Sequence, residues 1–195
     1  MAAPVRVAES TSHRSTERGS VQNSGFKLRS NPGQILISAE KNSTSTLTSV
    51  NTVEEYLQNE VTLGSLAGSF HSHPLTDLHF NRFKLIEKTL PGTWRLILDL
   101  SYPKGASVND GITSEDSSVS FQDLDGVVDA ILSKGKGTWL CKLDIARAYR
   151  NIPVHPSDRY LLGMRWLDRI YIDLALSFGG RPCAAIFSEV AKVIR

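Results

Sequence analysis

Two apolar runs with the two-residue period of a β-strand lie near the middle of the chain. They are FKLIEK, residues 83–88, and TWRLILDL, residues 93–100, and Leu90-Pro91-Gly92 between them is a turn signal of hairpin length. Four apolar residues of the second run fall on one face: Trp94, Leu96, Leu98 and Leu100. The pattern predicts a β-hairpin that presents Arg95 and Asp99 on the opposite face.

Three other segments carry apolar residues at the i, i+3, i+4 spacing of a helix. The first begins with a capping box formed by Thr52 and Glu55 and ends near Gly64. The second spans residues 121–133. The third has Pro182 in its first turn and continues to the last residue without a stop signal, so we expect the 195 residues to end inside an element.

Further strand signals lie in the second half of the chain. The run TWLCKLD, residues 138–144, predicts a strand that ends on Asp144. A compact turn through Pro156 leads to two strands, expected near 159–166 and 170–176 and joined by a short turn. This order predicts a meander of strands rather than βαβ units.

Residues 1–50 differ in composition from the rest of the chain. They contain ten Ser and five Thr, with scattered charges and no sustained helix or strand period. Such a segment is expected to be mostly disordered, and only QILIS, residues 34–38, has a strand-like pattern. We therefore divide the chain into a Ser/Thr-rich leader, 1–50, and one folded domain, 51–195.

The overall composition excludes several protein classes. Hydrophobic content of 41% and charged content of 22% are typical of a soluble globular domain, and a net charge of +2 leaves room for a local basic groove. The chain has no apolar run long enough to span a membrane and no apolar signal-peptide region. Cys141 and Cys183 form no CxxC pair, which argues against a disulfide scaffold and indicates an intracellular location, cytoplasm or nucleus. Cys141 is expected to be a small buried residue.

Residues 64–80 have the composition of a connecting loop and contain three histidines: His71, His73 and His79. A zinc site is one interpretation, because His-x-His followed by a third His can bind the ion. Solvated loop histidines are the other interpretation. Loops without Cys or acidic partners seldom bind zinc, which favours the second.

Asp144 follows an apolar run, where phosphoryl-transfer enzymes that use two metal ions place one of their carboxylates. Two or more such carboxylates hold two Mg²⁺ ions about 3.5–4 Å apart. From the spacing alone, an acid that caps the following turn explains Asp144 equally well. Asp173 alternates with Tyr171 and Ala175 and is expected to be an exposed or paired surface acid.

Three ordered motifs resemble a known family. They are TWRLILDLSYPKGASVNDGI at 93–112, LDIARAYRNIPVHPSDRYLLGMRW at 143–166 and YIDLALSFGGRPCAAIF at 171–187. They resemble the reverse transcriptase of retroelements, most closely that of DIRS-type, tyrosine-recombinase retrotransposons. The upstream segment EEYLQNEVTLGSLAGSFHSHPL resembles the lead-in of those polymerases, so the resemblance covers roughly residues 52–195.

The resemblance implies a metal and sugar site around the second motif. Asp144 is similar to the first-motif metal ligand, and the carbonyl of Ile145 is similar to a backbone ligand beside it. Tyr149 is similar to the steric gate that lies under the incoming sugar and rejects a ribose 2′-hydroxyl. The complete enzyme of this family uses Mg²⁺. A core aromatic is the alternative for Tyr149.

The resemblance also implies nucleotide-binding residues outside that motif. Lys88 and Arg95 are similar to residues of the fingers that clamp the triphosphate, where Arg can bond phosphate oxygens bidentately. Phe178 and Gly179 are similar to the turn before the helix of the second palm motif, which lies against the nucleotide and template. Solvated strand charges and an ordinary turn are the structural alternatives.

Three departures from the family pattern bear on activity. Residues 86–89 read IEKT where the family has valine-proline-lysine-lysine, so an acid lies beside the clamp. Residues 177–184 read SFGGRPCA where the family has proline-phenylalanine-glycine-leucine-arginine-serine-alanine-proline, and the extra glycine reshapes that turn. The third palm motif, a hairpin with a paired Asp-Asp, does not occur before Arg195. One carboxylate cannot hold two magnesium ions.

These observations predict an α+β fold: the fingers and first half of the palm of a right-hand polymerase, with a disordered N-terminal leader. The expected parent activity is RNA-directed DNA synthesis with Mg²⁺ and dNTPs on an RNA or DNA template-primer. This chain is expected to be an inactive fragment of that enzyme. A non-catalytic module that binds nucleic acid or another partner, derived from such a polymerase, is the alternative. An unrelated structural domain is a third interpretation.

Overall fold

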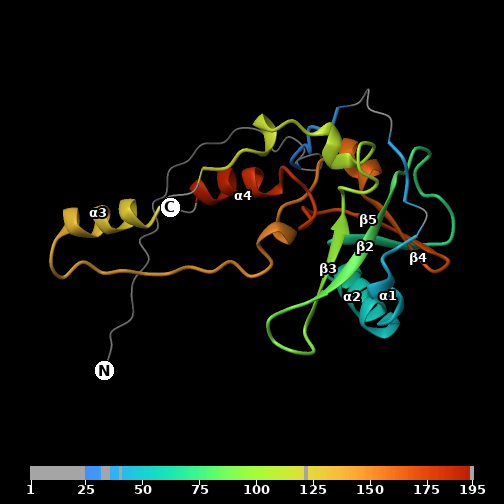
Figure 1. The fold of residues 1–195 in the computed structure, drawn as a ribbon, viewed down its shortest axis with the longest axis horizontal. Coiled ribbons are helices and arrows are strands. Elements are labelled where there is room, and N and C mark those ends of the chain that lie inside the picture. The colour runs from blue at the N-terminus through green and yellow to red at the C-terminus, as the bar shows by residue number, and fades with distance from the viewer. Residues whose placement is uncertain (1–24, 32–35, 40, 121–122, 194–195) are drawn as a thin grey trace, which may run out of the picture.

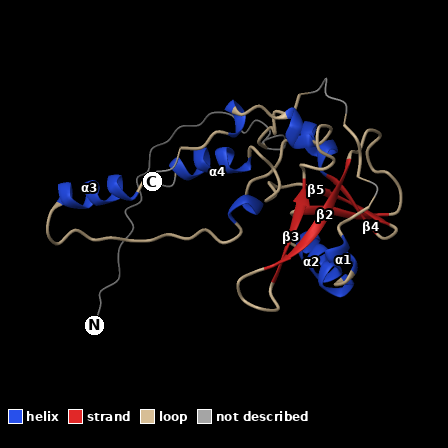
Figure 2. Cartoon of the chain, viewed as in Figure 1, coloured by secondary structure: helices blue, strands red, loops and turns tan. Residues whose placement is uncertain are grey.

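A five-stranded mixed sheet is the centre of the fold (Figures 1 and 2). The computed structural model describes residues 25–31, 36–39, 41–120 and 123–193. The sheet has the order β1-β5-β4-β2-β3, in which β2 and β4 run parallel and the other neighbours antiparallel. Its strands are β1 (Leu66–Phe70), β2 (Phe80–Glu87), β3 (Trp94–Asp99), β4 (Gly163–Trp166) and β5 (Arg169–Asp173). The helices are α1 (Thr44–Leu47), α2 (Val50–Thr62), α3 (Leu124–Lys134) and α4 (Cys183–Lys192). The predicted α+β class is confirmed.

The hairpin of β2 and β3 forms as its alternation predicts. Ile86 pairs with Arg95, and Arg82 pairs with Asp99. The opposite face is apolar and packs into the core, where Phe83 is fully buried. The helices α1 and α2 contact this hairpin, and α2 also contacts β1. Burial of one face of the hairpin therefore leaves the Arg95 face free for other contacts.

The helix α2 begins two residues earlier than its predicted capping box. Its first residue is Val50, and Ser49 at the N-cap makes no side-chain capping hydrogen bond. Thr52 and Glu55 therefore lie inside the helix, and the capping-box prediction is wrong. A true capping box occurs instead at Ser107 and Asp110, where it starts a short 3₁₀ helix.

Much of the segment predicted to be a disordered leader packs on the domain. The backbone of Phe26 exchanges hydrogen bonds with Pro153 and His155, and the Leu28 side chain is 1% exposed. Asn42 joins two strands, because its side chain accepts from the Phe83 amide (3.1 Å) and donates to the Arg165 carbonyl (2.7 Å). Disorder is thus wrong for the described parts of 25–50, which the apolar Leu28 and the side-chain bonds hold in place. Residues 1–24, 32–35 and 40 lie outside the described residues.

The segment predicted to be a loop at 64–80 contains the strand β1. It pairs with β5, so that Leu66 faces Asp173 across the ladder. The partner strand lies about a hundred residues away, so local composition does not reveal it. The predicted meander is confirmed only in part. Its last two strands form the hairpin of β4 and β5, but Pro156–Leu162 is a 3₁₀ helix instead of the start of a strand.

Residues 123–145 form an arm that extends away from the sheet (Figure 1). The helix α3 starts at its Asp123 cap, whose carboxylate accepts from the Gly126 amide, and it confirms the predicted helix for the part of 121–133 that the structure describes. The predicted strand 138–144 is wrong, because this stretch is extended chain without a pairing partner among the described residues. Trp139 is 96% exposed, and Cys141, predicted to be buried, is exposed as well. Alternation predicts a strand only where a neighbour supplies hydrogen bonds.

Candidate nucleotide-binding site

Three predicted site residues meet in one cation and aromatic cluster. The guanidinium of Arg95 on β3 lies 4.9 Å from the ring centre of Phe178. The Phe178 ring is 5.2 Å from that of Tyr149, which in turn is 5.6 Å from that of Phe187 on α4. These distances fit cation–π and tilted aromatic contacts. Burial, with a smaller effect of Cys183, raises the pKa of Tyr149, so its phenol stays protonated at neutral pH.

The turn that carries Phe178 packs tightly against β3. A Cβ atom on Gly179 would lie 1.6 Å from the Leu98 carbonyl oxygen, so this position requires glycine. Asn109 fixes the same turn from the other side: its Nδ2 donates to the Gly179 carbonyl (2.8 Å), and its Oδ1 accepts from the Arg181 amide (2.8 Å). The turn therefore holds Phe178 in place through backbone contacts.

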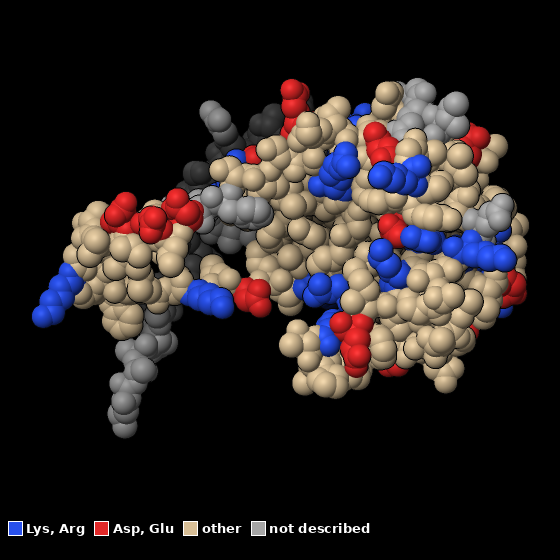
Figure 3. Space-filling view, in the orientation of Figure 1, with Lys and Arg blue, Asp and Glu red and all other residues tan. Residues whose placement is uncertain are grey.

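The outer face of the hairpin is basic. Arg82 and Lys84 both bind Asp99, at 3.0 and 3.3 Å, and Arg95 lies further along the same face. Burial of Asp99 acts to raise its pKa, but the bonds from Arg82 and Lys84 hold the pKa below its ordinary value. Lys88, just beyond β2, is exposed near the hairpin turn, and its amide donates to the Thr93 carbonyl. Basic side chains are seen over the sheet region with acidic ones among them, and acidic side chains line one side of α3 (Figure 3).

Asp144 and Ile145 lie at the end of the exposed arm, just before the turn that carries Tyr149. Within the described ranges no group of three or more His, Cys, Asp or Glu side chains is arranged to hold a metal ion. The residues present therefore do not form a two-magnesium site. Asp144 can offer one carboxylate, and the Ile145 carbonyl one further oxygen.

The three histidines of 71–79, which all lie in the described ranges, belong to no such group either. His79 is buried, with its ring nitrogen 3.4 Å from the Ser38 hydroxyl, and burial lowers its pKa. The expectation of a solvated histidine is therefore wrong for His79. His71 is exposed and contacts Arg169.

A buried ion-pair network anchors the turn that follows Asp144. Arg150 donates to both carboxylate oxygens of Asp173, at 2.6 and 2.8 Å, and to Oε2 of Glu60 at 2.9 Å. Arg147 binds the same Glu60 oxygen at 2.9 Å and the Ser65 hydroxyl at 2.8 Å. Asp173 is thus paired, as one of the two predicted alternatives has it, but it is buried and not on the surface. Burial raises the pKa of Asp173 to about 6, against the opposing effect of Arg150.

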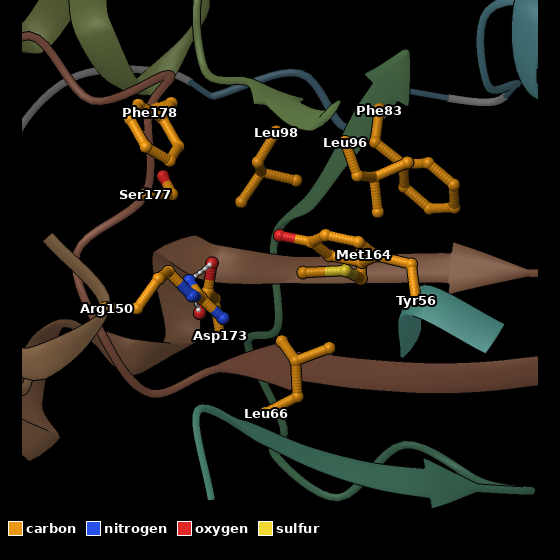
Figure 4. Close-up of a pocket in the computed structure, with 10 residues that line it drawn as sticks. All are labelled: Tyr56, Leu66, Phe83, Leu96, Leu98, Arg150, Met164, Asp173, Ser177 and Phe178. Carbon is orange, nitrogen blue, oxygen red and sulfur yellow. Dashed lines mark hydrogen bonds and ion pairs between the residues drawn. The ribbon is translucent and has the colours of Figure 1, made fainter. Parts of the chain in front are cut away.

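Figure 4 shows this ion pair beside a small cavity, with Phe178 and Ser177 on one side and Tyr56 and Met164 on the other. The free space in the cavity is about 20 Å³, which is room for one water molecule and not for a nucleotide. A nucleotide would therefore have to bind outside this cavity.

The sequence did not single out three residues that build the site: Asn109, Arg150 and Phe187. The capping box of Ser107 and Asp110 was a local signal for the ordered turn around Asn109. Phe187 appears in the sequence only as one member of a helical apolar stripe. Arg150 gives no local signal, because its partner Glu60 lies 90 positions earlier in the chain.

Comparison with known proteins defines the class of fold. No protein-family model matches the chain, and no curated protein matches its sequence. The solved structures that it matches include protease-reverse transcriptases, so the chain has a reverse transcriptase-like fold. At identities of 17% and 18% in the first two, the similarity establishes the fold alone.

Four of the matched structures are of foamy virus enzymes. The prototype foamy virus protease-reverse transcriptase, as its selenomethionine-labelled CSH mutant, matches with a TM-score of 0.59 and 17% identity over 86% of this chain and 20% of that chain. The native form matches with a TM-score of 0.56, 18% identity and 87% and 20% coverage. The foamy viral protease-reverse transcriptase in complex with dsDNA matches with a TM-score of 0.52, 15% identity and 89% and 31% coverage. The chain therefore spans a fifth to a third of the length of these proteins.

Among the described residues no helix is long and apolar enough to cross a lipid bilayer.

Proposed function

We propose that this chain is the nucleotide-binding part, fingers and first half of the palm, of a retroelement RNA-directed DNA polymerase of the DIRS type. The observation that carries the proposal is the cluster of Arg95, Phe178 and Tyr149. Each of these residues comes from a different one of the three motifs that resemble reverse transcriptases. A chance resemblance would give no reason for the three to lie in contact.

In this proposal each residue has a distinct task. Arg95 and Lys88 bind the triphosphate of an incoming dNTP, and the ring of Tyr149 lies under the sugar and excludes a 2′-hydroxyl. Phe178 and Gly179 form the platform against which the nucleotide packs. Asp144, with the Ile145 carbonyl, contributes to binding of Mg²⁺, the ion that neutralises the phosphate charge when bound. Since the described residues hold no group of three or more His, Cys, Asp or Glu side chains that could bind a metal ion, we propose that the chain is inactive by itself.

Primer extension on an RNA template tests the proposal with the 195-residue chain and with a longer chain that includes a downstream Asp-Asp hairpin. We expect synthesis by the longer chain only, and its loss in Asp144→Asn. Asp168→Asn is the matched control, because Asp168 is an exposed acid in the turn between β4 and β5. Synthesis by the 195-residue chain would contradict its inactivity. An active longer chain that tolerates Asp144→Asn would contradict the metal-binding role.

A non-catalytic nucleic-acid-binding module is the second candidate. The basic face favours it, because Arg82, Lys84 and Arg95 share that face, and Asp99 binds only Arg82 and Lys84 among these three. Two of the foamy viral structures are in complex with double-stranded DNA. Fluorescence anisotropy with a primer-template at several salt concentrations tests it: affinity that falls as salt rises, without synthesis by the longer chain, favours the module over the polymerase.

A further inference from the structure

The turn that carries Tyr149 is held by two arginines, one on each side of it. Arg147 precedes Tyr149 by two residues and has a left-handed backbone, with φ of 56°. Arg150 follows Tyr149 directly. Both guanidinium groups bind Oε2 of Glu60 at 2.9 Å, so one buried carboxylate on α2 holds the turn at two points.

Arg150 reaches further into the domain than Arg147. Its side chain is 7% exposed, and it joins α2 through Glu60, β5 through Asp173 and the start of β1 through the Ser65 carbonyl (3.4 Å). It also lies 3.5 Å from the Leu176 carbonyl, two residues before Phe178. Arg150 thus bonds the backbone that leads to Phe178. Because it is the residue next to Tyr149, its bonds also hold the backbone of Tyr149 in place.

The network is electrically balanced, with two guanidinium groups and two carboxylates. Buried ion pairs of this kind contribute little net stability compared with apolar packing, because desolvation offsets the attraction. Their directional bonds still specify one arrangement of the groups that they join. The arrangement specified here is the 5.2 Å contact between Tyr149 and Phe178.

We infer that Arg150 is a positioning residue of the nucleotide site, which sets the place of Tyr149 relative to Phe178 and thereby the discrimination between deoxyribose and ribose. The inference rests on the proposed function. Arg150 does not touch the nucleotide. It acts through Tyr149, so its loss changes which sugar is accepted, beside the stability lost when Glu60 and Asp173 keep buried charges without this partner.

The first test needs no activity and uses hydrogen exchange with mass spectrometry on the 195-residue chain. In Arg150→Met we expect amides of residues 146–152 to exchange about tenfold faster or more, from the lost charged hydrogen bonds, while β2 and β3 stay protected. The double variant Arg150→Met with Asp173→Leu removes both charges of the pair. It should recover thermal stability but keep fast exchange in the turn. Arg159→Met is the control, since Arg159 makes one bond, to the Val154 carbonyl.

Two results of this first test would overturn the inference. One is slow exchange of the turn in Arg150→Met. The other is restored protection in the double variant, since apolar packing would then position the turn equally well.

The second test uses the longer, active chain and compares kcat/KM for a dNTP with that for the matching rNTP. We expect the ratio to fall about tenfold in Arg150→Met, to recover in part in Arg150→Lys, and to stay unchanged in Arg159→Met. An unchanged ratio in an active Arg150→Met would overturn the inference and leave the proposed function intact. If the unsubstituted longer chain makes no DNA, the proposed function fails, and the exchange experiment alone decides whether Arg150 positions the turn.

Discussion

Gly179 is the residue at which the candidate site has least freedom. An added methyl group would lie 1.6 Å from the Leu98 carbonyl oxygen, and backbone atoms cannot move aside cheaply. We expect Gly179→Ala to lower the free energy of unfolding by about 3 kcal/mol or more, measured by urea denaturation. Gly92→Ala is the control: Gly92 has φ of +74° but no atom within 4 Å of the added group, so about 1 kcal/mol is expected. Equal losses would contradict the close approach of the turn to β3.

Asp173 makes the free energy of unfolding depend on pH. Burial raises its pKa from the ordinary 3.8 to about 6, so the folded chain binds a proton more tightly than the unfolded chain. The resulting stabilisation is complete below the unfolded pKa and is lost as pH rises through the folded one. We expect the free energy of unfolding, relative to Asp173→Asn, to fall by at most about 3 kcal/mol between pH about 4 and about 6.5. Urea unfolding at several pH values measures this, and a pH-independent difference would contradict it.

At the residue scale, the sequence predicted which residues cluster at the candidate site better than it predicted which polar side chains are buried. Arg95, Tyr149 and Phe178 were predicted as site residues and lie together. Their binding roles stay predictions, as do those of Lys88, Gly179, Asp144 and Ile145. The sequence could not predict that Asp173 and His79 are buried, because burial of a polar side chain depends on partners such as Arg150 and Ser38 that are distant in the chain.

The accessibility of the backbone in the arm, residues 123–145, can be tested directly. Residues 138–145 have no backbone hydrogen bond to another described residue, and Trp139 and Leu143 are 96% and 74% exposed. Within residues 41–193, we expect limited digestion with trypsin to cleave first after Lys136 and Lys142. Arg147, which is bound to Glu60, should be cut later, although it lies only five residues beyond Lys142. Peptide mass spectrometry over time measures the order. First cuts in the hairpin of β2 and β3 would contradict it.

Elements were predictable where their signal is local. The hairpin of β2 and β3 has its turn and both strands within 20 residues, and α3 has its apolar spacing and Gly135 stop in one segment. The errors concern pairing over long distances. The strand β1 forms because β5 lies beside it and supplies hydrogen bonds. Residues 138–144 form no strand because no described strand lies beside them.

At the scale of the whole molecule, the sheet order joins segments that the chain separates widely. The parallel pair of β2 and β4 brings Phe80 beside Gly163, and because β2 also pairs with β3, the first and second motifs share one sheet. The sequence resemblance predicted this reverse transcriptase-like fold, which the solved foamy virus structures confirm at the level of fold. The DIRS-type assignment stays a prediction. Composition alone missed how the described parts of 25–49 take part, because Ser side chains there bond strand backbones, as Ser38 does with the Phe80 amide and Ser45 with the Leu85 amide.

The described parts of 25–49 therefore belong to the folded domain, and removal of the segment should show this. Leu28 is 1% exposed, and its amide donates to the Asp158 carboxylate at 2.7 Å. We expect a chain that starts at Val50 to lose several kcal/mol of unfolding free energy, from lost apolar burial and side-chain bonds, roughly 2–3 kcal/mol of it from Leu28. Within the full chain, Leu28→Ala should cost about 2–5 kcal/mol by urea denaturation. Leu47→Ala is the matched control, because Leu47 is 59% exposed and its loss should cost less than about 0.5 kcal/mol. Equal stability of the shortened and full chains would return this segment to the status of an unattached leader.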